Sequence, residues 1–141
     1  YSQPNSFGQQ VAERFPSASY DMEEAGKCLA LNRGTASVFH LMRVLEVGLY
    51  ALGKDLGLQS IQENWHNAIA QIEKSIRDLP GHGARKRVYS EMAAHCMHVK
   101  EAWRNRTMHI GRVYPDEKAE QILDNARGFM QVLASQVGEQ S

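Results

Sequence analysis

The sequence lacks any cysteine pair at metal or redox spacing, because its only cysteines, Cys28 and Cys96, lie far apart and form no C-x-x-C pattern. Nothing suggests secretion, so we expect two reduced, buried thiols. The first ten residues have neither the charged nor the apolar region of a signal peptide, and no apolar run approaches the roughly 18 residues that span a membrane. We therefore expect a cytoplasmic protein with no membrane association.

The chain also has no net charge, because 16 Lys and Arg residues balance 16 Asp and Glu residues. This balance argues against a uniformly basic nucleic-acid-binding protein. The charge is unevenly distributed, however: residues 84–112 hold seven basic residues against two acids, a net +5, which leaves −5 on the rest of the chain. Such a segment fits local phosphate binding, and it equally fits a solvated helix face that neighbouring acids balance.

The signatures of several common catalytic classes are absent, namely GxxxxGK[ST], GxGxxG, GxSxG and HExxH. Nucleotide hydrolysis and acyl transfer of the usual kinds are therefore unsupported. His95 and His98 stand three residues apart, but no carboxylate or cysteine joins them at ligand spacing. We expect no metal and no cofactor, and we interpret these two histidines as structural or interface groups.

What the sequence does contain is helical periodicity. Residues 1–16, punctuated by Pro4 and Pro16, predict an extended or loosely ordered lead-in. Beyond it, apolar residues recur at i, i+3 and i+4, and Ser19 or a neighbouring serine is expected to cap the first helix. The expected helices cover residues 20–31, 35–53, 64 to about 78, 84 to about 109, and 115 onwards. Residues 17–141 thus predict one all-α domain, an up-and-down bundle of about five helices.

A polar stretch, "RNRTMH", closes the fourth of these expected helices at residues 104–109. An Arg followed by a His after four to six intervening residues occurs three times, at Arg33–His40, Arg77–His82 and Arg104–His109, so the spacing alone is weak evidence. The third occurrence differs from the others in its context. It lies at the end of a long helix, has an amide directly after the Arg, and precedes the helix start "YPDE".

The stretch "RNRTMHIGRVYPDEKAEQILDNARGFMQVLA" resembles the HEPN domain superfamily, whose members share an Arg, a polar residue and a downstream His late in an α-helical bundle. The stretch "LNRGTASVFHLMRVLEVGLYALGK" also looks like the second helix of bacterial HEPN-like domains, so the resemblance covers about half of the chain. It implies a compact dimeric bundle. Many members are metal-independent ribonucleases of defence and toxin–antitoxin systems, and others are RNA-binding, nucleotide-binding or dimerisation modules.

The resemblance implies that Arg104, Asn105 and His109 are the catalytic residues, and elementary chemistry agrees. RNA carries its own nucleophile, the 2′-OH, so cleavage requires proton transfer and positive charge on the phosphorane, but no metal. His109 suits proton transfer, Arg104 suits the phosphate, and Asn105 could orient either. On one continuous helix Arg104 and His109 stand ~140° apart. The implied dimer resolves this separation by bringing two copies of the motif to one cleft.

Other residues are assigned to the same site by their position. The expected RNA contacts are His98, Arg106, Arg112 and Tyr114. Glu46, on the second helix, is expected to orient Arg104. The expected partners are RNA, a second copy of the chain, and an antitoxin or another domain of a longer chain.

Other interpretations stay open at this point. Arg104 and His109 could simply cap the C-terminal end of a helix, where cations suit the helix dipole. The domain could also be a non-catalytic module that binds RNA, dimerises or regulates, or it could be the nucleotide-binding partner of a nucleotidyltransferase.

Overall fold

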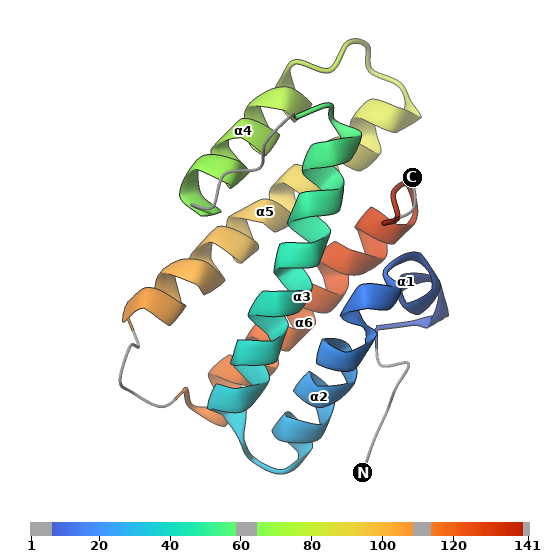
Figure 1. The fold of residues 1–141 in the computed structure, drawn as a ribbon. Coiled ribbons are helices and arrows are strands. Elements are labelled where there is room, and N and C mark those ends of the chain that lie inside the picture. Colours follow the sequence, from blue (N-terminus) through green and yellow to red (C-terminus); the bar gives the residue numbers. More distant parts are fainter. Residues whose placement is uncertain (1–6, 59–64, 109–113, 140–141) are drawn as a thin grey trace.

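The computed structural model describes residues 7–58, 65–108 and 114–139, without the side chains of residues 105–108. This part of the chain contains six α-helices, one short 3-10 helix and no strand (Figure 1). The predicted all-α bundle is therefore confirmed. The elements are α1 (Gln9–Arg14), η1 (Pro16–Ala18), α2 (Ser19–Ala30), α3 (Gly34–Asp55), α4 (Trp65–Arg77), α5 (Ala84–Met108) and α6 (Asp116–Ala134).

The helix α3 is the centre of the bundle. It packs against α2 and α6 along much of its length and against α4 more lightly, while α5 packs against α4 and α6 (Figure 1). Gly48 allows the close approach of α3 to α6, because an added Cβ there would lie 2.6 Å from Met130 Sδ and 3.0 Å from Phe129 Cε2. This contact places the largest side chains of α6 directly against the backbone of α3.

The apolar stripes predicted for the main helices are the ones that the structure buries. The stripe of α3 consists of Val38, Leu41, Met42, Leu45, Leu49 and Leu52. The stripe of α4 consists of Trp65, Ala68, Ile69, Ile72 and Ile76. The stripe of α6 consists of Ile122, Ala126, Phe129, Met130 and Leu133. A stacked pair of tryptophans, Trp65 and Trp103, with ring centroids 5.1 Å apart, joins α4 to α5.

The prediction of an extended lead-in over residues 1–16 is wrong for Gln9–Arg14, which form α1, and for Pro16, where η1 begins. Phe7, Val11 and Phe15 are at most 1% exposed and belong to the same core as the other helices. Gln131 Nε2 donates to the carbonyl of Phe7 at 3.2 Å, and the amide of Glu139 donates to the carbonyl of Arg14 at 3.0 Å. A six-residue helix is too short to show periodicity, and it persists because the last part of the chain covers it.

Two helix starts also differ from expectation. Ser19 is the first residue of α2 and makes no capping bond, because η1 leads directly into the helix through Ala18. Pro115, expected in the first turn of the last helix, is the N-cap residue, with φ −61° and ψ 148°, and α6 begins one residue later. Its first turn carries Asp116 and Glu117, as the helix dipole favours.

The expectation that no segment is long and apolar enough to span a membrane needs correction for α3. Its 22 residues include an 18-residue window with a mean hydropathy of 1.2, which passes a test of length and composition alone. Single polar residues interrupt the apolar run, but leucines, valines and alanines keep the mean hydropathy high. Of that window, 61% is buried inside the bundle, as in the core helix of a globular domain.

Candidate functional site

Of the three predicted catalytic residues, the structure describes the side chain of Arg104 only. Arg104 is exposed near the C-terminal end of α5. The side chains of Asn105 and Arg106 lie outside the described part of the structure, as do residues 109 and 112, the positions of His109 and Arg112. Their roles stay predictions.

Tyr114, just before α6, is held against the start of α3. The amide of Tyr114 donates to Oγ1 of Thr35, in the first turn of α3, at 2.8 Å. Gly34 makes this contact possible, because an added Cβ would lie 2.9 Å from Asp116 Oδ1 and 3.1 Å from the carbonyl oxygen of Tyr114. The start of α6 is therefore fixed against the start of α3.

The position of Tyr114 differs from the one predicted. It was predicted to contact RNA, yet it is only 8% exposed and belongs to the hydrophobic core. A buried ring does not present a face on which a base can stack. Its observed part is to fasten the segment between α5 and α6 to α3.

His98 is exposed, as an RNA contact requires, and it lines a groove between α5 and α6. Glu101, Lys118, Gln121 and Asn125 are the other polar residues of that lining. The groove has a volume of about 80 Å³, whereas small-molecule sites commonly occupy about 300–1,000 Å³. His98 is thus available as a surface contact on α5, in a groove much smaller than a typical small-molecule site.

Several basic residues of the segment 84–112 make contacts within the fold. Lys86 Nζ donates to the carbonyls of Ile76, Arg77 and Leu79 at the end of α4, at 3.1, 2.8 and 2.7 Å. Lys100 pairs with Glu73 at 3.3 Å, and the Arg85 guanidinium lies 4.7 Å from the ring centre of Tyr89. Within the described residues, Arg87 and Arg104 are the two exposed cations of this segment with no hydrogen bond or ion pair.

Glu46 lies on a different surface from the one predicted. It lines a cavity of about 520 Å³ together with Tyr50, Lys54 and Asp55 of α3 and with Glu139 near the C-terminal end. No residue of α5 belongs to that lining, and Glu46 makes no contact with Arg104 among the described side chains. Its predicted part in orienting Arg104 gains no support from this position.

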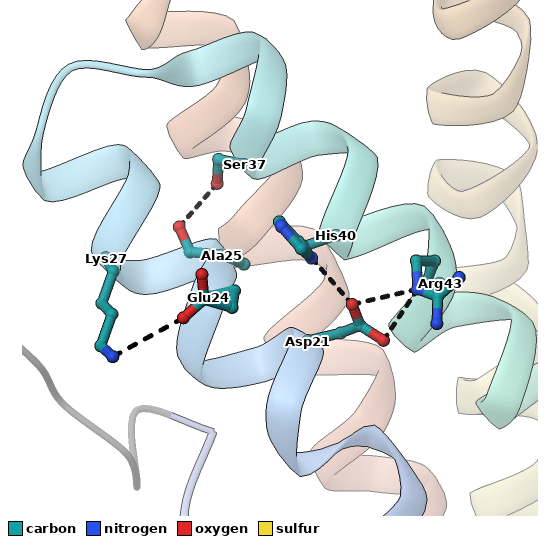
Figure 2. Close-up of polar contacts among 7 residues, drawn as sticks. All are labelled: Asp21, Glu24, Ala25, Lys27, Ser37, His40 and Arg43. Atoms are coloured by element: carbon teal, nitrogen blue, oxygen red, sulfur yellow. Dashed lines mark hydrogen bonds and ion pairs between the residues drawn. The ribbon is translucent and has the colours of Figure 1, made fainter.

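A polar cluster that the sequence analysis did not assemble lies between α2 and α3. Figure 2 shows His40 and Arg43, both from α3, reaching toward the carboxylate of Asp21 on α2. His40 Nδ1 lies 2.8 Å from Asp21 Oδ1, and Arg43 Nε donates to both carboxylate oxygens at 3.1 and 3.0 Å. The Asp21 side chain is 7% exposed, whereas that of Arg43 is 61% exposed. One buried carboxylate therefore positions two side chains at the surface.

The sequence carries part of the signal for this cluster. His40 and Arg43 stand three residues apart, which places them on one face of a helix. The missing part is the register of α2 against α3, which is set by packing and by the bond from Ser37 Oγ to the carbonyl of Ala25, 2.8 Å long (Figure 2). Asp21 alone looks like an ordinary acid in the first turn of a helix.

Neither cysteine offers a reactive thiolate. Both are free thiols, Cys96 buried and Cys28 half-buried. Burial raises the pKa of Cys96 to about 12 and also raises the pKa of Cys28. Nucleophilic chemistry at these thiols is therefore disfavoured.

His95 is the histidine whose titration the fold changes most clearly. Its ring packs on Gly128 of α6, where an added Cβ would lie 3.0 Å from His95 Cε1. Its Nδ1 is buried without a hydrogen-bond partner among the described residues. Burial lowers the pKa of His95, while Glu91 opposes this effect and His98 adds to it.

This lowered pKa predicts a loss of stability in acid. The unfolded chain takes up the His95 proton below about pH 6.5, whereas the folded chain takes it up only at lower pH. The free energy of unfolding should therefore fall as the pH drops through that range. We expect a smaller difference between the urea midpoints at about pH 7.5 and about pH 5.5 in His95→Gln than in the wild type. The exposed neighbour provides the control: an equal reduction in His98→Gln would contradict this assignment.

Comparisons with protein-family models, with curated proteins and with solved structures found no match to this chain. The resemblance to the HEPN superfamily therefore stays a prediction.

Proposed function

We propose that the chain is a HEPN-like domain that cleaves RNA as a dimer, without a metal, in the cytoplasm and in a defence or toxin–antitoxin context. The proposal rests on one observation, the exposure of Arg104 and its lack of a partner among the described residues. It is exposed at the end of α5 and makes no ion pair or hydrogen bond among the described residues, whereas Lys86 and Lys100 of the same basic segment are used inside the fold. Among the described residues, no partner occupies the Arg104 guanidinium, which supports its availability to a ligand.

The chemistry follows from the residue types. The guanidinium of Arg104 binds the scissile phosphate and stabilises the charge that develops on its oxygens. One His109 of the dimer takes the proton of the 2′-OH, whose oxygen attacks the phosphorus. The other His109 gives a proton to the departing 5′-oxygen. The products are a 2′,3′-cyclic phosphate and a 5′-hydroxyl end.

The test is cleavage of single-stranded RNA in excess EDTA by the wild type, Arg104→Ala and His109→Ala. We expect each variant to cleave at least about 100-fold more slowly, since one positioned proton-transfer group or charge donor contributes about that much. Arg87→Ala is the matched control, because Arg87 is an exposed arginine at the other end of the same helix. It should cleave like the wild type.

Other outcomes reject the proposal. Absence of cleavage by the wild type, or equal residual cleavage in all proteins, removes the catalytic function. A monomeric active species, measured by light scattering at the assay concentration, removes the shared dimeric site.

A non-catalytic RNA-binding or dimerisation module is the second candidate. The net charge of zero favours it. Binding of RNA without cleavage by the wild type would select this function.

A further inference from the structure

The cavity that Glu46 lines has the size of a ligand site. It is formed by the second half of α3, by Ser17 of η1 and by Gly138 and Glu139, which follow α6. Its volume of about 520 Å³ falls within the roughly 300–1,000 Å³ of common small-molecule sites. Tyr50, which is 62% exposed, belongs to the lining, so the cavity opens to solvent. Among the described residues, none from α5 lines it, so the cavity is separate from the proposed cleavage site.

The lining of this cavity is negatively charged. Three carboxylates belong to it, those of Glu46, Asp55 and Glu139. Its one cation among the described residues is the ammonium group of Lys54, so the net charge of the lining is −2. Within the described part of the chain Lys54 makes no ion pair or hydrogen bond, so it neutralises none of these acids by direct contact. A negative lining favours a cationic ligand and disfavours phosphates and other anions.

The fold uses only part of the acceptor capacity of these acids. The hydroxyl of Tyr89 donates to Oδ2 of Asp55. The amide of Ser17 donates to Oε1 of Glu139 at 2.9 Å. These two bonds hold the carboxylates in place and leave the second oxygen of each without a partner among the described residues. The carboxylate of Glu46 is exposed and has no partner in the same part of the structure, so three acceptors are open to a ligand.

The acids are spread along the cavity, with apolar surface between them. Glu46 and Asp55 both lie on α3, nine residues apart, which is about 13 Å along the helix axis. The wall between them includes Val47, Ala51 and the ring of Tyr50. Among the described residues, no three acids, histidines or cysteines lie close enough together to hold one metal ion. Separate cationic groups joined by an apolar chain therefore fit this lining better than a single compact ion.

We propose that this cavity binds an aliphatic polyamine, whose ammonium groups pair with Glu46, Asp55 and Glu139 while its methylene chain lies over the apolar wall. The ring of Tyr50 adds to the attraction, because an ammonium group near the face of an aromatic ring is stabilised. The proposal goes beyond RNA cleavage and does not depend on it, since the two sites share no residue of the described structure.

The test titrates the wild type with spermidine by isothermal calorimetry at low salt. We expect Glu46→Gln and Glu139→Gln each to weaken binding about three- to fivefold, as the loss of one solvent-accessible ion pair predicts. In Glu139→Gln the amide oxygen of the new side chain still accepts the bond from Ser17, so the fold is retained. Tyr50→Ala should weaken binding about threefold.

Two further variants separate binding in the cavity from general attraction of charge. Lys54→Gln should bind spermidine about threefold more tightly, because it removes a positive charge from the lining. Val47→Phe fills the cavity without changing its charge and should weaken binding more than either glutamine variant. The matched control is Glu120→Gln, which removes an exposed acid of α6 outside the lining and should bind like the wild type. Thermal unfolding without ligand shows whether each variant keeps the fold.

A comparison of probes tests the ligand class. Butylamine has one ammonium group on a similar chain and can pair with only one of the acids, so it should bind about tenfold more weakly than spermidine. Equal affinity for the two amines, or no saturable binding of spermidine by the wild type, overturns the proposal. So does a loss in Glu120→Gln as large as that in Glu46→Gln, or weaker binding by Lys54→Gln than by the wild type. Each of these results is independent of whether the wild type cleaves RNA.

Discussion

Phe129→Ala is expected to lower the free energy of unfolding by about 3–5 kcal/mol. Phe129 is fully buried on α6, and its ring lies against Gly48 of α3, where these two helices approach closely. Truncation removes the apolar surface of the ring and leaves a cavity that the packed backbones of α3 and α6 cannot close. Urea unfolding followed by circular dichroism measures the change.

Phe39→Ala is the matched control for this prediction, because it makes the same truncation at a ring that is 59% exposed. Its loss should be below about 1 kcal/mol, as for most surface substitutions. A similar loss in both variants would mean that the α3–α6 contact is not where the stability lies.

Gly48→Leu is expected to destabilise the protein by about 3 kcal/mol through overpacking. A Cβ at this position would already lie 2.6 Å from Met130 Sδ and 3.0 Å from Phe129 Cε2, so a whole leucine side chain must push the helices apart. The higher helix propensity of leucine returns only about 1 kcal/mol. The urea midpoint of the variant measures the net effect.

A comparison and a double variant test the cause. Gly83→Leu should cost about 1 kcal/mol or less, since a Cβ there meets no atom within 4 Å and the change only replaces a glycine by a less favourable residue directly before α5. Combined with Phe129→Ala, Gly48→Leu should cost less than the sum of the two single effects, because the leucine can occupy the space of the lost ring. Full additivity would contradict a direct contact between positions 48 and 129.

The fold class and most of the helices followed from periodicity alone. Long helices such as α3 and α4 carry several apolar residues on one face, and burial of that face is the reason for the pattern. Periodicity did not predict the short helix α1, because its single buried residue, Val11, makes no pattern within six residues. Its stability comes from contacts with residues more than a hundred positions away, which local sequence does not reveal.

The candidate sites likewise contain features that local sequence predicts and features that depend on how distant segments pack. The exposure of Arg104 agrees with its polar setting at the end of a helix. The burial of Tyr114 depends on where the segment after α5 meets α3, and no local pattern contains that information. The cluster around Asp21 needed the register of two helices, since its carboxylate and its partners are 19 and 22 residues apart in sequence.

The closure of α1 against the last part of the chain has a consequence for synthesis on the ribosome. The carbonyls of Phe7 and Arg14 emerge first, yet their donors, Gln131 and Glu139, are made more than a hundred residues later. The cover that α6 gives to α1 is therefore missing from this part of the core, which includes Phe7 and Phe15, while more than a hundred further residues are translated. We infer that this domain completes its folding only after residue 139 has left the exit tunnel, and that a nascent chain stalled earlier would present these two rings to chaperones.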